Sequence, residues 1–480
     1  MLETLSHWTS WTALYLTFEW GVRLVMLCWV PTRRSPEAAK GWLLLLFFQP
    51  VIGLALYGLI GRPNMPAWRR ERLRKWFDLM RPIRAQIESH IAPFVPQLDG
   101  RARHAATLAH NLGRLPPLAG NSVEFIGEYQ SAIDRLARDI DTAEHHVHLL
   151  YYIFADDEAT RPVIDAMARA VRRGVKCRVL VDALGSRKQL PKLRPTLEAA
   201  GVQLVEILKS GPLKKFGARA DLRNHRKIAV IDGRTAFTGS QNLISSNFKP
   251  GITYEEAVVR VTGPAVVELQ SVFVGDWYLE TEEVLDTPDM VPAPQATGDV
   301  AVQVLPSGPT FAPLGNQRTV VSLLYAAERR IVMTTPYFIP DAALQNALQT
   351  AAIRGVEVHL IVSEIEDQFL VGQAQKSYYE ELLETGVRIH LFQEEFLHAK
   401  HLTIDDDVAM IGSSNMDLRS FTLNAEISLL LYDRNVTMRL HQEQRRYFDR
   451  SKPLTLDEWR LRPFKARFSQ NICRLMSPLL

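Results

Sequence analysis

Two long apolar runs stand near the start of the chain, before any other regular pattern. Residues 42–60 (WLLLLFFQPVIGLALYGLI) contain no charged side chain. A helix over this run rises about 1.5 Å per residue and spans about 28 Å, close to the thickness of a bilayer core. Residues 11–30 are also apolar but include Glu19 and Arg23, which lie four positions apart and can pair on one helical face.

The two runs predict a transmembrane helical hairpin over residues 1–65. Pro50 and Gly53 would kink its second helix, a feature that membrane helices tolerate. The charges of the first run leave an interfacial or re-entrant helix as the alternative there, and a buried core helix is the alternative for the second run. A cleaved signal peptide is not expected, because the first run lacks a preceding basic region and a small-residue cleavage site.

Basic residues follow the second run and alternate with aromatic residues. Arg69, Arg70 and Arg72 belong to this stretch, as do Trp68 and Trp76. We expect residues 66–115 to form a basic linker or helix on an anionic membrane surface, with a solvated helical face as the alternative. The excess of Lys and Arg after the second run predicts that both ends of the hairpin, and the domains that follow, are cytoplasmic.

Beyond residue 115, short apolar strands alternate with helical patterns, and the whole series occurs twice. Tyr151 to Phe154 precede a helical pattern and a strand over 177–181, and Pro336 to Ile339 precede the same order of elements with a strand over 358–362. This alternation predicts α/β layers. We therefore expect two tandem domains related by a pseudo-twofold axis, over residues 116–286 and 300–450.

The remaining segments connect or follow these domains. A Pro- and Gly-containing linker is expected over 287–299, and the additional length of the first copy is assigned to a Gly- and Lys-rich loop over 209–221. A basic tail occupies 451–480. It is interpreted either as a second contact with the membrane surface or as a packing helix.

Composition narrows the possible functions only slightly. The chain is 47% hydrophobic and 23% charged, which is typical of a globular protein. A net charge of +3 is too small to indicate a general affinity for nucleic acid. Three widely spaced cysteines predict neither a disulfide framework nor a zinc site, which fits a reducing compartment.

One polar motif stands in both copies. His225, Lys227 and Asp232 recur at identical spacing as His398, Lys400 and Asp405. A Gly-Ser-x-Asn segment follows each motif at one fixed distance and supplies Ser240, Asn242, Ser413 and Asn415. A single match of this kind is weak, but two matched copies are unexpected by chance.

The residue types indicate phosphodiester chemistry. Residues two apart on a strand point the same way, so each His shares a face with its Lys. Two such pairs brought together would hold a five-coordinate phosphorus between two imidazoles and two ammonium groups. One His can attack phosphorus while the other protonates the leaving oxygen, and this chemistry requires no metal and no cofactor.

A carboxylate should orient each imidazole through its second ring nitrogen. Glu426 precedes an apolar strand in the second copy, and Glu256 or Glu255 is its counterpart in the first. We expect Ser240, Asn242, Ser413 and Asn415 to add hydrogen-bond donors to the phosphate. Asp232 and Asp405, which end the motif strands, are interpreted as orienting or structural residues. The cluster His145, His146 and His148 is interpreted as packing rather than as a metal site.

The doubled motif resembles that of the phospholipase D superfamily. Over nearly its whole length the chain is similar to bacterial cardiolipin synthases with two such motifs. Further segments that carry this resemblance are Trp42 to Gly61, Tyr151 to Phe154, Asp182 to Ser186, Asn415 to Ser420 and Ser477 to Leu480.

The resemblance implies transfer of a phosphatidyl group between two phosphatidylglycerol molecules, giving cardiolipin and glycerol. It implies His225 as the nucleophile and His398 as the general acid, with the reverse assignment left open, and it implies a multi-pass protein of the bacterial inner membrane. A hydrolase with the same site is the alternative, and phosphatidylserine synthase is a further variant. A nucleic-acid phosphodiesterase and a non-catalytic lipid scaffold fit less well, and the oligomeric state is left open.

Overall fold

The structure is a computed structural model that describes residues 2–34, 36–61, 67–209, 221–312, 314–475 and 477. It divides into two compact units, residues 1–70 with 210–221 and residues 71–209 with 222–480. The predicted loop over 209–221 lies almost wholly outside the described residues, as do Arg62 and the last three residues of the tail. We describe each unit by itself.

Among its described residues, the N-terminal unit contains the whole of α1 (Leu2–Trp29), α2 (Pro36–Phe48) and α3 (Pro50–Ile60). Helices α2 and α3 pack closely, because Gly53 lets the backbone of Leu46 approach to where a side chain would stand. Met26, Val30 and Tyr57 are buried in the small core that results. The predicted pair of Glu19 and Arg23 forms on α1, at 3.1 Å.

The run over residues 42–60, expected to form one helix kinked at Pro50 and Gly53, belongs to two helices in the structure. Residues 42–60 divide at Gln49, whose non-helical backbone (φ −137°, ψ 76°) separates α2 from α3, and Pro50 begins the new helix. Within the described parts of the chain, no helix is both long enough and apolar enough to cross a membrane. Glu19 and Arg23 interrupt the uncharged part of α1. Pro50 divides the uncharged run over residues 42–60 between α2 and α3.

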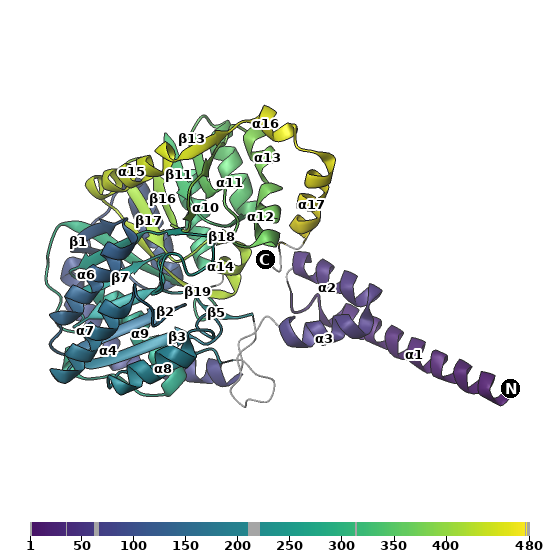
Figure 1. The fold of residues 1–480 in the computed structure, drawn as a ribbon, viewed down its shortest axis with the longest axis horizontal. Coiled ribbons are helices and arrows are strands. Elements are labelled where there is room, and N and C mark those ends of the chain that lie inside the picture. The colour runs from purple at the N-terminus through teal and green to yellow at the C-terminus, as the bar shows by residue number, and fades with distance from the viewer. Residues whose placement is uncertain are drawn as a thin grey trace. The chain divides into compact units, whose positions relative to one another are not determined.

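The second unit is built on one mixed sheet that contains both copies of the repeat (Figure 1). The strands of the first copy follow the order β1-β9-β7-β6-β2-β3-β4, and those of the second follow β10-β19-β17-β16-β11-β13-β14. The antiparallel pair β1–β10 joins the copies at the centre, and β20 adds to the outer edge of the second. The order is therefore the same outwards from the centre in both directions, as the repeat predicts.

The first copy follows the amphipathic helix α4 (Ala67–Ile91), the short η1 (Ala92–Phe94) and α5 (Gly100–Gly113). Its strands are β1 (Leu118–Ile126), β2 (His146–Tyr151), β3 (Lys176–Asp182), β4 (Gln203–Ile207), β5 (Arg223–Asn224), β6 (Ile228–Ile231), β7 (Thr235–Gly239), β8 (Tyr254–Glu255) and β9 (Val258–Thr262). Its helices are α6 (Tyr129–Asp141), α7 (Arg161–Arg172), α8 (Leu190–Ala199) and α9 (Ala265–Thr281), and η2 (Pro288–Met290) lies in the predicted linker.

The second copy has eleven strands with the edge strand included, and eight α-helices follow α9 among the described residues. The strands are β10 (Val300–Ser307), β11 (Arg330–Thr334), β12 (Phe338–Ile339), β13 (Glu357–Ser363), β14 (Arg388–Phe392), β15 (Phe396–Leu397), β16 (His401–Ile404), β17 (Val408–Gly412), β18 (Met416–Asp417), β19 (Asn424–Leu431) and β20 (Ser451–Leu454). The helices are α10 (Gly315–Ala326), α11 (Ala342–Ile353), α12 (Phe369–Lys376), α13 (Tyr379–Glu384), α14 (Leu418–Thr422) and α15 (Arg434–Asp449). The tail adds α16 (Leu456–Arg460) and α17 (Phe464–Leu475).

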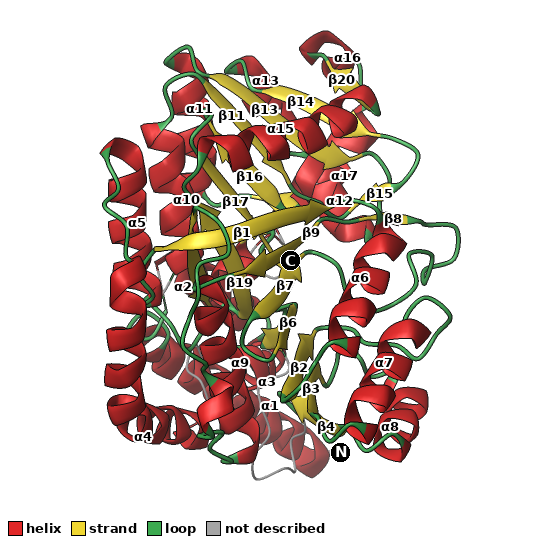
Figure 2. Ribbon diagram, turned by 90° about the vertical axis from the view of Figure 1, so that its left-hand side faces the viewer, coloured by secondary structure: helices red, strands yellow, loops and turns green. Residues whose placement is uncertain are grey.

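Helices cover the sheet and form a core in each copy (Figure 2). In the first copy, α6 and α7 bury their apolar faces against β2 and β3, and in the second copy α10 and α11 do so against β11 and β13. Helix α9 is buried around most of its circumference, which explains why its sequence shows almost no polar face. The rigid sheet fixes the ends of the strands that carry the doubled motif.

Two of the three clustered histidines, His146 and His148, are buried between the sheet and α9. His146 and His148 lie inside β2, fully buried, with their rings stacked at a centroid distance of 4.4 Å. Phe273 of α9 stacks on the other side of His148. His146 and His148 are therefore packing residues of the sheet and α9, whereas the side chain of His145 is half-exposed.

Candidate active site

Both motif histidines lie at breaks between short strands rather than within one continuous strand. Residues 225–227 connect β5 to β6, and residues 398–400 connect β15 to β16. In each copy the short strand before the His pairs with the other copy instead of with its own sheet neighbours. The break therefore places each His outside the strands of its own copy and next to a strand of the other copy.

The two cross-copy ladders are equivalent. Strand β5 runs parallel to β19, and the N–H of His225 donates to the carbonyl of Ala425 at 2.8 Å. Strand β15 runs parallel to β8, and the N–H of His398 donates to the carbonyl of Glu255 at 2.7 Å. The next residue along each partner strand is a glutamate, so each ladder carries a carboxylate to the histidine of the opposite copy.

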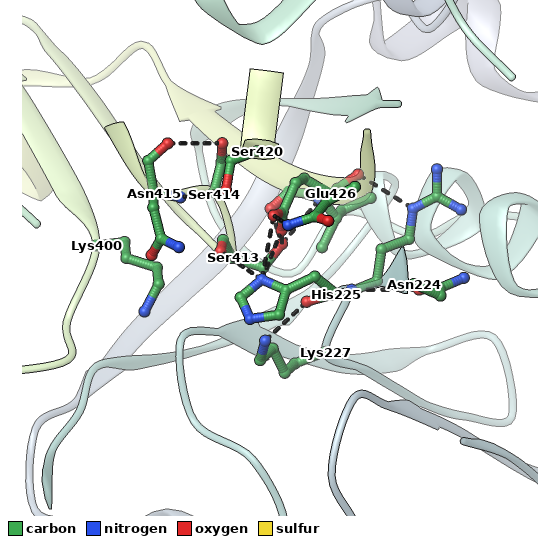
Figure 3. A network of polar contacts seen from close by, with 12 residues as sticks. Asn224, His225, Lys227, Lys400, Ser413, Ser414, Asn415, Ser420 and Glu426 are labelled. Carbon is green, nitrogen blue, oxygen red and sulfur yellow. Dashed lines mark hydrogen bonds and ion pairs between the residues drawn. The ribbon is translucent and has the colours of Figure 1, made fainter. Parts of the chain in front are cut away.

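Glu426 orients His225 (Figure 3). The Nδ1 atom of His225 lies 3.0 and 3.1 Å from the two carboxylate oxygens of Glu426 and 3.1 Å from the carbonyl oxygen of Ser413. All three are acceptors, so Nδ1 carries the proton and donates it. The Nε2 atom is then left as the unprotonated nitrogen of a neutral ring, the form required of a nucleophile.

Glu256 orients His398 in the same way. Its Oε1 atom lies 2.7 Å from Nδ1 of His398, and both side chains are buried. Glu255, the alternative that the sequence leaves open, instead forms an ion pair with Arg450 at 3.1 Å. The alternation of side chains along β8 explains the difference, because neighbouring residues of an extended chain point to opposite sides.

The two lysines are buried beside their histidines. The Nζ of Lys227 donates to the carbonyl of His225 at 2.7 Å, and the Nζ of Lys400 donates to the carbonyl of His398 at 2.5 Å. Burial, together with the mutual repulsion of the two ammonium groups, lowers the pKa of Lys227 to about 7. Burial lowers the pKa of Lys400 to about 8.

The electrostatic couplings show that the two halves converge on one site. Burial is the main cause that lowers the pKa of both imidazoles, to about 4 for His398. Lys400 of the second copy also lowers the pKa of His225, and Lys227 of the first copy lowers that of His398. Burial alone would raise the pKa of Glu256 and Glu426. The adjacent His and Lys side chains have the larger effect, so the pKa of both glutamates is lowered.

The serines of the Gly-Ser-x-Asn segments support the glutamates. The hydroxyl of Ser413 donates to Oε2 of Glu426 at 2.5 Å, and that of Ser240 bonds to the backbone of Ala257. The amide oxygen of Asn242 accepts a hydrogen bond from the N–H of Ile153. Its NH2 group is the donor that remains for a ligand. The buried amide oxygen of Asn415 bonds to no residue that the structure describes.

Asp232 and Asp405 bond to the backbone rather than to an imidazole. Each adopts a positive φ, and each carboxylate accepts three N–H groups from the segment that leads into the neighbouring strand, β2 or β11. Arg101 also pairs with Asp405 at 2.7 Å. Burial opposes ionisation of Asp405, but these contacts lower its pKa. Both residues therefore hold the sheet rather than the reacting groups.

Several tyrosines near the histidines were missed by the sequence analysis. Tyr152 meets His225 edge-on at a ring distance of 5.0 Å, and Tyr254 and Tyr337 meet His398 at 5.6 and 6.3 Å. The recurrence of Tyr152 and Tyr337 at matching places in the repeat was an available signal. The hydroxyls of Tyr254 and Tyr337 both donate to Asp367, at 3.0 and 2.8 Å, and no motif indicated that residue.

A buried ion pair lies behind the first motif. The guanidinium of Arg226 binds Asp276 of α9 at 2.5 Å and donates to the carbonyl of Glu426 at 3.1 Å. Asn224 adds a hydrogen bond to Asp276 at 3.0 Å. Because Arg226 stands between His225 and Lys227, its contacts fix the backbone of the motif and of the glutamate that orients it.

The arrangement is suited to acid–base and nucleophilic chemistry on an anion. Two carboxylate-oriented imidazoles face one site that also holds two ammonium groups. Within the described residues, no group of three His, Cys, Asp or Glu side chains is arranged to hold a metal ion. Fold and site together define a two-motif enzyme of the phospholipase D class, with one site built from both copies.

The comparisons with known proteins identify the family. The family model described as "Cardiolipin synthase, PLD-like domain" matches residues 136–277 and 320–451. Cardiolipin synthase A of Proteus mirabilis is 33% identical over 93% of this chain and 94% of its own length, and that of Pectobacterium carotovorum is 32% identical over the same shares. The chain belongs to the cardiolipin synthase family, and the assignment made from its sequence is confirmed.

A solved structure supports the fold alone. The crystal structure of a phosphatidylserine synthase from Haemophilus influenzae covers 79% of this chain and all of its own, with a TM-score of 0.61 and 17% sequence identity. The prediction of two tandem α/β domains of the phospholipase D type is thereby confirmed.

Proposed function

We propose that this cardiolipin synthase transfers a phosphatidyl group from one phosphatidylglycerol to another through a phosphohistidine intermediate. The observation that carries the proposal is the convergence of two imidazoles, each bonded through Nδ1 to a buried glutamate. A phosphate diester is the ligand that this set of groups fits, because its transition state spreads negative charge over oxygens that two ammonium groups can contact.

In the first step the Nε2 of His225 attacks phosphorus. The bond from phosphorus to the glycerol oxygen breaks, and His398 gives its Nε2 proton to that oxygen, which leaves as glycerol. Burial favours the neutral form of His398 in the empty site. An anionic diester beside the ring favours the protonated form, so binding of the substrate prepares the acid.

In the second step the acceptor replaces glycerol. Its free hydroxyl gives a proton to His398, which is now neutral, and the oxygen attacks phosphorus of the phosphohistidine. The bond between phosphorus and Nε2 of His225 breaks, cardiolipin leaves, and both imidazoles return to their initial states. Lys227 and Lys400 stabilise the charge in both steps, while Asp232 and Asp405 hold the strands on which the motifs depend.

We also propose that residues 1–70 attach the enzyme to the inner membrane, with the catalytic unit in the cytoplasm and on an anionic lipid surface. Large apolar side chains are exposed on this unit, which is unusual for a surface that faces water. They include Trp11, Phe18, Trp20, Leu24, Leu44, Phe48, Ile52 and Leu59. A vesicle flotation assay of the full chain, with and without anionic lipid, would test the attachment.

The product of the reaction distinguishes a synthase from a hydrolase. Purified full-length protein in vesicles with labelled phosphatidylglycerol should give cardiolipin and free glycerol in equal amounts. The reverse reaction should appear when glycerol is added in excess, because the proposed steps are reversible. Phosphatidic acid as the main product would show that water is the acceptor and would contradict the proposal.

The lowered lysine pKa values predict a loss of activity at high pH. A lysine is charged only below its pKa, and the pKa values of Lys227 and Lys400 are lowered to about 7 and about 8. We expect kcat/KM, which reports the free enzyme, to fall as the pH rises through this range. In Lys227→Arg the fall should move to higher pH, because arginine keeps its charge. An unchanged profile in this variant would assign the titration to another group.

A further inference from the structure

The catalytic unit contains an apolar cavity of about 400 Å³, and Arg226 of the first motif is one of its lining residues. Helix α4 lines it with one face, which includes Trp76, Phe77 and Met80. Helix α9 lines the other side with Val272, Gly275 and Leu279. Its volume lies in the range of small-ligand pockets, and its walls are mostly hydrocarbon.

A glycine of α9 helps to leave this space open. A Cβ added at Gly275 would lie 3.5 Å from the indole nitrogen of Trp76, an ordinary contact distance. Alanine therefore fits at this position, whereas a larger side chain would extend into the cavity.

The polar residues of the cavity divide into two groups. Arg226 and Asp276 form a neutral pair at the wall next to the motif. Of the exposed residues, Arg84 pairs with Glu88 at 2.7 Å, and the guanidinium of Arg114 lies over the ring of Phe77 at 5.1 Å. Arg114 forms no ion pair with a described residue. The exposed part of the lining therefore carries one unneutralised positive charge.

The cavity is separate from the reaction site. Neither the catalytic histidines nor the two lysines contribute to its lining. The Arg226 side chain faces it, and the same guanidinium bonds to the carbonyl of Glu426, the residue that orients His225. A molecule in the cavity would thus contact the wall that supports the first motif without contacting the reacting phosphorus.

We propose that this cavity binds one acyl chain of an anionic phospholipid, whose phosphate lies at Arg114, in addition to the lipids that react. The walls match a hydrocarbon chain, and the free charge of Arg114 matches an anionic headgroup. The proposal rests on the proposed function for the presence of phospholipid at this enzyme. It does not require that the lipid in the cavity be turned over.

A photoreactive phosphatidylglycerol with a diazirine on one acyl chain tests the proposal. The full-length protein in vesicles is irradiated, and the labelled peptides are identified by mass spectrometry. We expect labels on residues of α4 and α9 that line the cavity. In Gly275→Leu these labels should fall about tenfold or more, because the new side chain occupies the space of the acyl chain. Gly275→Ala is the matched control and should keep them.

Two further variants separate the cavity from general effects on folding and from the headgroup. Val272→Phe fills the cavity from another position and should lower the same labels if Gly275→Leu proves unstable. Arg114→Asn removes the charge while keeping a residue that tolerates the positive φ found there. It should reduce the preference of labelling for phosphatidylglycerol over a phosphatidylcholine probe.

The outcomes are distinct from those that test the reaction. Labels that stay on α4 and α9 at full strength in both cavity-filling variants would overturn the proposal, as would labelling of other segments only. Free palmitate that displaces the probe as well as phosphatidylglycerol does would also overturn it, in favour of a fatty-acid site. Absence of cardiolipin from the wild-type reaction would contradict the proposed function, while the labelling would still decide the cavity.

Discussion

His225→Ala is expected to lower the rate of cardiolipin formation by about 10⁴-fold or more, because it removes the atom that bonds to phosphorus. His398→Ala should lower overall transfer by a similar factor, since it removes the imidazole that protonates the leaving oxygen. The two variants should differ in what they retain. In His398→Ala the nucleophile is intact, so slow attack can still load the enzyme with the phosphatidyl group.

Labelled phosphatidylglycerol and denaturing gel analysis measure this difference. We expect acid-labile, base-stable label on His398→Ala and none on His225→Ala. His145→Ala, which changes a half-exposed histidine away from the site, is the control and should behave as the wild type. Label retained on His225→Ala and absent from His398→Ala would reverse the roles of the two histidines.

Glu426→Gln should lower activity by about 10²- to 10⁴-fold, although Glu426 lies in the second copy and its histidine in the first. Glutamine can present its NH2 group to Nδ1 of His225 and so favour the wrong tautomer. It also removes the negative charge that balances the imidazolium formed during the reaction. Glu255→Gln is the matched control. The carboxylate of Glu255, next to Glu256 in the sequence, pairs with Arg450 and contacts neither imidazole.

The loading step shows which histidine each glutamate serves. In the background of His398→Ala, loading depends on His225 alone. Adding Glu426→Gln should slow it further, whereas adding Glu256→Gln should have little additional effect, because the partner of Glu256 is already absent. The opposite result would mean that each glutamate serves the histidine of its own copy.

Much of the fold could be predicted from the sequence, because the sequence contains an internal repeat. The matching Tyr and His segments predicted two α/β domains, and one sheet with the same strand order in both directions from β1 and β10 contains them. The N-terminal helices were less predictable. An uncharged run over 42–60 has the hydropathy of a membrane helix, and Pro50 predicts a kink in it, but the packing of Gly53 on Leu46 depends on tertiary contacts.

The residue types of the site could be predicted from the sequence, but the contacts between them could not. Spacing alone paired His225 with His398 and Lys227 with Lys400 as equivalents. Spacing could not find Asp367, since a carboxylate that binds two tyrosines from separate segments leaves no local pattern. The Arg226–Asp276 pair was missed for the same reason, as its two members lie on different elements 50 residues apart.

The sequence by itself determined that this protein carries two equivalent sets of phosphate-binding and acid–base groups on an α/β scaffold. Only the tertiary structure decided which carboxylate serves which imidazole. The His–Glu pairs join residues 201 and 142 positions apart, and both cross from one copy to the other. The reason is the parallel pairing of β5 with β19 and of β8 with β15, which is set by the packing of the two copies and by no spacing within either one.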